Sequence, residues 1–129
     1  MREAIFPAKQ QSSYEAYGYS AAIKSGDFLF VSGQVGVEAD GSAEPDPAKQ
    51  FQLAFDNLRA VLEAAGASFD NVVDVTSFHV NMHQHFDDFA AAKQAAFPSK
   101  PFPNWTAIGV SSLADPALLL EIKVVARLK

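Results

Sequence analysis

The stretch from Leu118 to Arg127 constrains the fold more than any other part of the sequence, because two kinds of residue alternate along it. Apolar residues occupy every second position, and apolar and charged residues share the positions between them: Leu118, Leu120, Ile122, Val124 and Ala126 form the first set, and Leu119, Glu121, Lys123, Val125 and Arg127 the second. Successive side chains of a β-strand point to opposite faces, so this pattern predicts a strand with one apolar and one mixed face. The mixed face would be uncovered in a monomer, which indicates a subunit interface that includes polar groups.

Two segments with helical periodicity can cover the apolar face. The first helix is predicted to begin at Asp46-Pro47, where a good N-cap residue precedes a proline at the first helical position, and to end near Gly66. Its apolar residues are spaced by three and four positions and form one stripe: Phe51, Phe55, Leu58, Leu62 and Ala65. The second helix runs from about Phe86 to Phe97 and must end before Pro98, because a proline disfavours helical geometry at the preceding residue.

The remaining apolar segments are typical of strands. Residues 20–23 and 28–31 flank a Ser25-Gly26-Asp27 turn and predict a hairpin, and residues 72–80 predict a third strand. Residues 105–110 and 118–127 flank a turn region at residues 113–116, which favours antiparallel pairing of these two strands. The order of elements indicates an α+β fold, with two helices packed on one face of a mostly antiparallel sheet.

The composition favours a single globular domain, residues 1–129, in a reducing compartment. There is no cysteine, which excludes disulfides, thiolate metal ligands and a cysteine nucleophile. The formal net charge is −5 and the ten Lys and Arg residues are scattered, so we expect no nucleic-acid partner. The N-terminal stretch MREAIFPAKQ contains charges and no long apolar run, so we expect no signal peptide, no membrane partner and a cytoplasmic location.

Four stretches carry a family resemblance: SAAIKSGDFLFVSGQVG, LAFDNLRAVLEAAGASFDNVVDVTSF, FPNWTAIGVSSL and LEIKVVARL. Together they resemble the Rid/YjgF family (RidA-like proteins) over nearly the whole chain, and PNWTAIGV resembles its YjgH-like branch. The resemblance implies a chorismate-mutase-like fold and a homotrimer whose sheets form a central barrel, with clefts between neighbouring subunits. It also implies hydrolysis of reactive imines and enamines to a keto acid and ammonia, without a cofactor or a metal.

The resemblance assigns three residues to such a cleft. Tyr19 matches the family's cleft tyrosine, and Ser32 matches its cleft serine within the SGQ turn. Glu121 matches the acidic residue that orients the attacking water or protonates the enamine carbon, with one residue inserted between the last two strands. A carboxyl group in a partly apolar cleft has a raised pKa, which suits acid–base work. The alternative is an ordinary interface glutamate paired with Lys123 or Arg127.

Other positions depart from the family pattern. Trp105 stands where the family places an arginine that binds the substrate carboxylate, Ala107 where it has a small polar residue or cysteine, and Lys93 where asparagine is common. Trp105, Ala107 and Gly109 share one strand face, so the indole is expected to fill the space of the arginine head group. Trp105 could be a platform for a ligand or a packing residue at the interface, and Lys93 a replacement cation or a solvated side chain. Thr106 in the same segment is a further candidate for substrate binding.

The three histidines raise a metal hypothesis that the pattern supports only weakly. His83 and His85 are expected in a polar turn, without acidic residues at the spacing of a metal site. His79 shares a strand face with Ser77 and could be an acid or base of the cleft, or a structural histidine. Neither a Ser-His-Asp elbow nor a phosphate-binding glycine loop is present.

Two functions follow from these residues. The first is hydrolysis of a small imine or enamine that lacks the usual carboxylate, with Glu121 as the acid–base group. The alternative is a non-catalytic trimer that holds a small molecule against Trp105, which the loss of the arginine favours. A ribonuclease activity conflicts with the acidic charge and ranks last.

Overall fold

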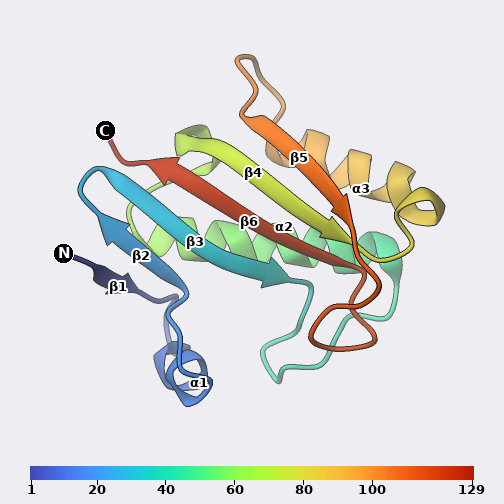
Figure 1. Ribbon diagram of the computed structural model, residues 1–129, viewed down its shortest axis with the longest axis horizontal. Helices are drawn as coiled ribbons and strands as arrows, with labels where there is room; N and C mark the ends of the chain where they lie inside the picture. Colours follow the sequence, from blue (N-terminus) through green and yellow to red (C-terminus); the bar gives the residue numbers. More distant parts are fainter.

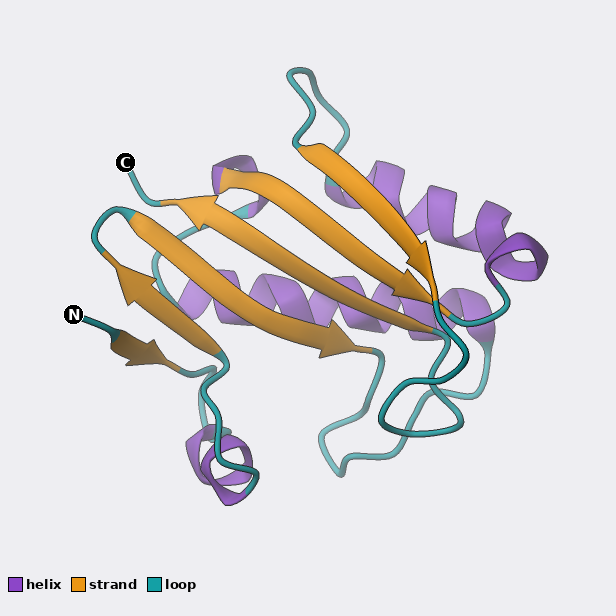
Figure 2. Cartoon of the chain, in the orientation of Figure 1, coloured by secondary structure: helices purple, strands orange, loops and turns teal.

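One six-stranded sheet, covered on a single face by two long helices, makes up the body of the molecule (Figures 1 and 2). The computed structural model describes residues 1–129, and the strand order in the sheet is β1-β2-β3-β6-β4-β5. The strands are β1 (Glu3–Ile5), β2 (Ala22–Ser25), β3 (Phe28–Val35), β4 (Val72–His79), β5 (Asn104–Gly109) and β6 (Leu120–Arg127), and the helices are α1 (Gln11–Ala16), α2 (Pro47–Ala64) and α3 (Met82–Ala96), with a 3₁₀ turn at Phe69–Asn71. This confirms the α+β fold class and the position of both long helices on one face.

Strand β6 lies at the centre of the sheet, antiparallel to both β3 and β4. Its alternation is as predicted: Leu120, Ile122 and Val124 are fully buried beneath the helices, while Glu121 and Val125 on the other face are only half-buried. The second face carries no covering layer within the chain and is called the open face below (Figure 2).

Helix α2 forms where the sequence predicted it, because the N-cap signal and the apolar stripe both indicate a helix over the same residues. The carboxylate of Asp46 accepts a hydrogen bond of 3.0 Å from the backbone N–H of Lys49, which caps the helix ahead of Pro47. Phe51 and Phe55 are buried against the sheet. Burial of a large apolar side chain stabilises the folded state by about 1.5–3 kcal/mol.

The predicted antiparallel pairing of the last two strands is wrong. β5 pairs with β4 and runs parallel to it, with Val75 opposite Trp105 and Ser77 opposite Ala107. Helix α3 makes the crossover that a parallel pair requires, and β5 therefore becomes an edge strand (Figure 1). Residues 110–119 are not a hairpin turn: they lead the chain past β4 to the central position of β6.

Helix α3 begins at Met82, four residues before the predicted start, so the prediction of a polar turn at His83 and His85 is also wrong. Asn81, two residues after the end of β4, has a left-handed conformation (φ 54°), which asparagine tolerates, and α3 starts directly after it. Strand β1 and helix α1 were missed because they are short and α1 buries no residue. No helix is both long and apolar enough to cross a membrane.

Candidate functional site

The residues assigned from sequence form two groups on opposite faces of the sheet. Trp105 and Ala107 lie opposite Val75 and Ser77 of β4, which are buried on the helix-covered face. Glu121 lies on the open face of β6. A single chain therefore does not bring Trp105 and Glu121 together.

The SGQ segment of β3 forms an irregularity that shapes the open-face group. Regular pairing with β6 is interrupted between Val31 and Gln34. Ser32 bonds instead toward β2: its N–H donates to the carbonyl of Ala21 at 2.9 Å and its hydroxyl donates to the carbonyl of Ser20 at 2.7 Å. The hydroxyl proton is thus engaged, and the Oγ lone pairs stay free to accept a hydrogen bond from a ligand N–H.

Glu121 lies directly over Gly33 of this segment. A Cβ at position 33 would lie 2.6 Å from the carboxyl carbon of Glu121, so the glycine leaves the room that the side chain occupies. Burial raises the pKa of Glu121, and the positive charge of Lys123 partly offsets that effect. Glu121 has no ion pair with Lys123 or Arg127 inside the chain, where Arg59 and Asp56 form the single salt bridge.

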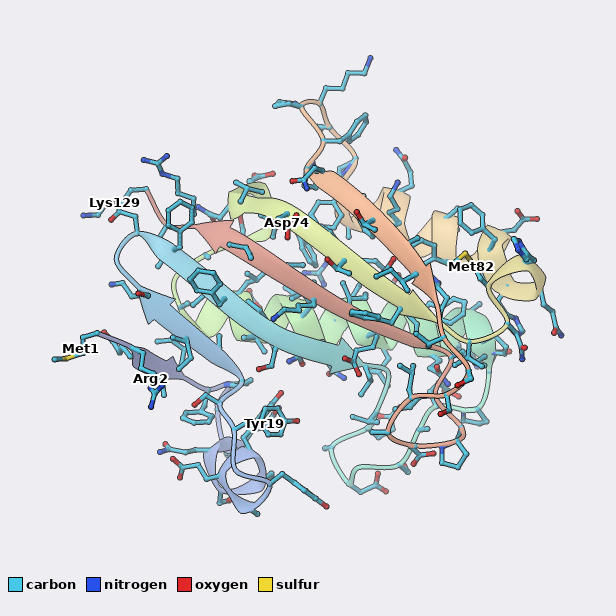
Figure 3. All side chains as sticks on the ribbon, in the orientation of Figure 1. Met1, Arg2, Tyr19, Asp74, Met82 and Lys129 are labelled. Carbon is cyan, nitrogen blue, oxygen red and sulfur yellow. The ribbon has the colours of Figure 1, made fainter.

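Tyr19 joins this group from the segment after α1 (Figure 3). Its ring packs edge-on against Tyr14 at a centroid distance of 5.1 Å, and the Tyr14 hydroxyl accepts a hydrogen bond of 3.2 Å from the Gln34 side chain. Burial, together with the nearby Tyr14 and Glu121, raises the pKa of Tyr19, so its hydroxyl stays protonated as a donor. Tyr19, Ser32 and Glu121 thus form one polar group, called the acid group below.

Trp105 forms the centre of the second group, between β5 and α3. Its ring lies 5.9 Å from that of Phe89 and 5.6 Å from that of Phe97, both edge-to-face. The Lys93 ammonium lies 4.9 Å from the ring centroid, and the indole N–H donates a 2.9 Å hydrogen bond to the Ser77 hydroxyl. These two ring contacts, the cation–π contact and the hydrogen bond fix the orientation of Trp105, whose side chain remains partly exposed.

His79 and Ser77 extend this group beneath Trp105. The Ser77 hydroxyl lies 2.7 Å from Nε2 of His79, and the His79 ring packs edge-on against Phe89 at 4.5 Å. Burial lowers the pKa of His79 and keeps its imidazole neutral. We call Lys93, Trp105, Ser77 and His79 the tryptophan group.

Ser77 and His79 share one face of β4, as predicted, and the hydrogen bond between Ser77 and Trp105 was not predicted. The turn-like residues 113–116 predicted that β5 pairs with β6, whereas the parallel register of β5 with β4 brings Trp105 next to Ser77. Ala107 and Gly109 are exposed beside Trp105 on the edge strand, whereas Thr106 lies opposite Thr76 on the open face. Thr106 is therefore separated from Trp105 by the sheet.

Comparisons with known proteins agree with this fold. The family model described as Endoribonuclease L-PSP matches residues 10–128. RutC family protein YjgH of Escherichia coli (strain K12) is 54% identical over 127 residues, which cover 98% of this chain and 95% of that protein. A solved structure of protein YJGH has a TM-score of 0.91 at 54% identity, with 98% and 95% of the two chains covered.

More distant relatives define the wider class. Rv2704 of Mycobacterium tuberculosis, a member of the YjgF/YER057c/UK114 family, has a TM-score of 0.81 at 26% identity and covers 98% of this chain and 99% of its own. A 2-iminobutanoate/2-iminopropanoate deaminase of Dermatophagoides farinae is 35% identical over 103 residues, 77% of each chain. The chain belongs to the Rid/YjgF family and has its chorismate-mutase-like α+β fold. Within that family it is similar to protein YjgH.

Proposed function

We propose that the protein is a homotrimer that hydrolyses a small reactive imine or enamine lacking a carboxylate, in clefts between its subunits. The observation that carries this proposal is the division of the site. The acid group and the tryptophan group lie on opposite faces of one sheet, so a second subunit is needed to bring an acid group against a tryptophan group.

The open face has the properties of a surface that is covered in an assembly. Phe28 and Phe30 of β3 are 40% and 45% exposed there, and Ile108 of the edge strand is 39% exposed. Large apolar side chains gathered on one uncovered sheet face favour an interface between subunits. Because Glu121 lies on the same face, assembly would also close solvent off from its carboxyl group.

The acid group has the parts that imine hydrolysis requires. Protonated Glu121 gives its proton to the imine nitrogen, or to the carbon of an enamine, and then accepts a proton from the water whose oxygen bonds to the imine carbon. The resulting carbinolamine releases ammonia as the carbonyl forms. Tyr19 donates a hydrogen bond and Ser32 accepts one, which positions the reacting groups. The raised pKa of Glu121 supports its role as the acid.

The tryptophan group supports a substrate without a carboxylate. Trp105 replaces the arginine whose guanidinium would form two parallel hydrogen bonds with a carboxylate. The indole N–H cannot take over this role, because it already donates a hydrogen bond to Ser77. The Lys93 ammonium lies over the indole ring, where a cation–π contact holds it. We therefore assign Trp105 and Ala107 to substrate binding through apolar contact, and Lys93 to the same binding surface, where its ammonium lies over the indole. Thr106 would contribute to binding from the open face of the sheet.

A non-catalytic trimer that binds a small molecule is the second candidate. Its support is the same replacement of the arginine by a packed Trp105. RNA is disfavoured as a partner by the net charge of −5, although the family model is described as an endoribonuclease. We also propose a cytoplasmic location, and the lack of cysteine agrees with such a reducing compartment.

The test is hydrolysis of freshly generated imines, half with a carboxylate and half without, by the wild type and Glu121→Ala, after light scattering has measured the assembly. We expect Glu121-dependent turnover that prefers the imines without a carboxylate. Turnover that is equal in both proteins would exclude Glu121 as the acid, and a trimer without turnover on any imine would favour the binding function.

A further inference from the structure

Ser77 is a buried polar residue that the proposed chemistry does not use. Its side chain is fully buried (0% exposed), and its hydroxyl lies 2.9 Å from Nε1 of Trp105 and 2.7 Å from Nε2 of His79. A hydroxyl closed off in this way cannot attack a substrate that arrives from solvent. Its role must lie in the two side chains that it joins.

The direction of each hydrogen bond follows from the donors available. The indole nitrogen can only donate, so the Ser77 oxygen accepts from Trp105. The single hydroxyl proton has no other acceptor, and it therefore donates to Nε2 of His79, which must carry its own proton on Nδ1. Burial alone lowers the pKa of His79, which favours this neutral form; no charged group contributes to that shift.

We infer that Ser77 and His79 are positioning residues that fix the indole of Trp105 and thereby select substrates with an uncharged, apolar group. The fixed orientation turns the one polar atom of the indole inward, so that its exposed part is hydrocarbon. Phe89 and Phe97 hold the ring edge-to-face, and Lys93 lies over its face. The selection of substrate rests on the proposed function, whereas the fixing of the indole does not.

Trp105 is the single tryptophan of the chain, so its emission reports directly on this geometry. In Ser77→Ala the indole loses its acceptor, and we expect greater quenching by acrylamide than in the wild type. Titration with cyclohexanone, a neutral carbonyl compound, should show about five- to tenfold weaker binding to Ser77→Ala, as the loss of one hydrogen bond implies. 2-Oxobutanoate, which carries a carboxylate, should bind the wild type more weakly than cyclohexanone does. Ser77→Thr keeps the hydroxyl, so its quenching by acrylamide should return to the weaker level of the wild type. Ser112→Ala, on an exposed loop, is the matched control and should behave like the wild type.

A measurement on the wild type covers the case in which Ser77→Ala does not fold. The single indole N–H resonance should exchange slowly with solvent and should shift with pH at the same midpoint as the ring protons of His79. An indole N–H that exchanges freely and ignores the titration of His79 would overturn the inference. Equal binding of cyclohexanone by the wild type and Ser77→Ala would overturn the selection of apolar groups. Absence of imine turnover would count against the proposed function alone, because neither signal requires catalysis.

Discussion

On the open face of the sheet, Glu121 lies over Gly33 with no ion pair inside the chain. On the helix-covered face, the buried His79 is hydrogen-bonded to Ser77, whose hydroxyl also accepts a hydrogen bond from the indole of Trp105. Burial favours the neutral form of both residues, by raising the pKa of Glu121 and lowering that of His79. The difference lies in what surrounds them. A buried ionisable group without partners is free to exchange a proton with a substrate, and one whose partners are satisfied fixes the geometry of its neighbours.

The largest effect is expected from Glu121→Gln, which keeps the shape of the side chain and removes its proton transfer. We expect imine turnover to fall by about 100-fold or more, within the usual range for a general acid–base group. Lys123→Met is the matched change on the same strand: it removes the charge that lowers the pKa of Glu121, so the pH profile of turnover should move upward. Steady-state kinetics across pH measures both. If Glu121→Gln turned over imines at the wild-type rate, Glu121 would not be the acid–base residue.

The next effect concerns the space over Gly33. Gly33→Ala places a methyl group where the Glu121 side chain lies, and we expect about a tenfold loss of turnover with the fold retained. Gly109→Ala is the control at the tryptophan group, because its new Cβ would meet only the Met82 side chain at 3.9 Å, an ordinary contact. Turnover and circular dichroism should separate the two variants. Equal activity in both would show that the carboxyl position over Gly33 is unimportant.

The two groups should also respond to pH with opposite signs. As the pH falls below the usual histidine value of 6.5, the unfolded chain protonates at His79 before the folded chain does, so the free energy of unfolding decreases until the lowered pKa is reached. At Glu121 the folded chain takes up the proton first, so the free energy of unfolding increases as the pH falls from the raised pKa toward 4.5.

Denaturant unfolding at fixed protein concentration, over this pH range, tests these signs in His79→Gln and Glu121→Gln. The first variant should lose the decrease near and below pH 6.5, and the second should lose the increase at lower pH. Identical pH profiles for the wild type and both variants would mean that neither group differs in pKa between the folded and unfolded chain.

The smallest effect is expected at Lys93. Lys93→Met keeps an unbranched side chain over the indole and removes the cation–π contact, at a cost of about 0.5–1 kcal/mol in the free energy of unfolding. Binding of 2-oxobutanoate should change little, since Lys93 is not the carboxylate receptor in this account. A large loss of 2-oxobutanoate binding would instead make Lys93 a replacement for the family's arginine.

Much of this molecule could be predicted from its sequence because local signals and burial agree. The alternation along residues 118–127 and the Asp46-Pro47 helix start both reflect the fold directly. The place of β5 could not be obtained in this way, because a turn-like sequence at residues 113–116 does not reveal which strand the chain returns to. That one error concealed the contact of Trp105 with Ser77. The division of the site between two faces required the three-dimensional arrangement, since Trp105 and Glu121 are only sixteen positions apart in the sequence.

Subunit mixing tests the central claim, the shared cleft, most directly. Glu121→Ala and Trp105→Ala chains are each assembled alone, then unfolded together in equal amounts, refolded and assayed for hydrolysis of an imine without a carboxylate. If each cleft takes Glu121 from one subunit and Trp105 from its neighbour, about a quarter of the clefts in the mixture regain both residues, and activity should rise to that share of the wild-type value. Activity in the mixture that equals the average of the two separate variants, with trimers confirmed by light scattering, would contradict a site shared between subunits.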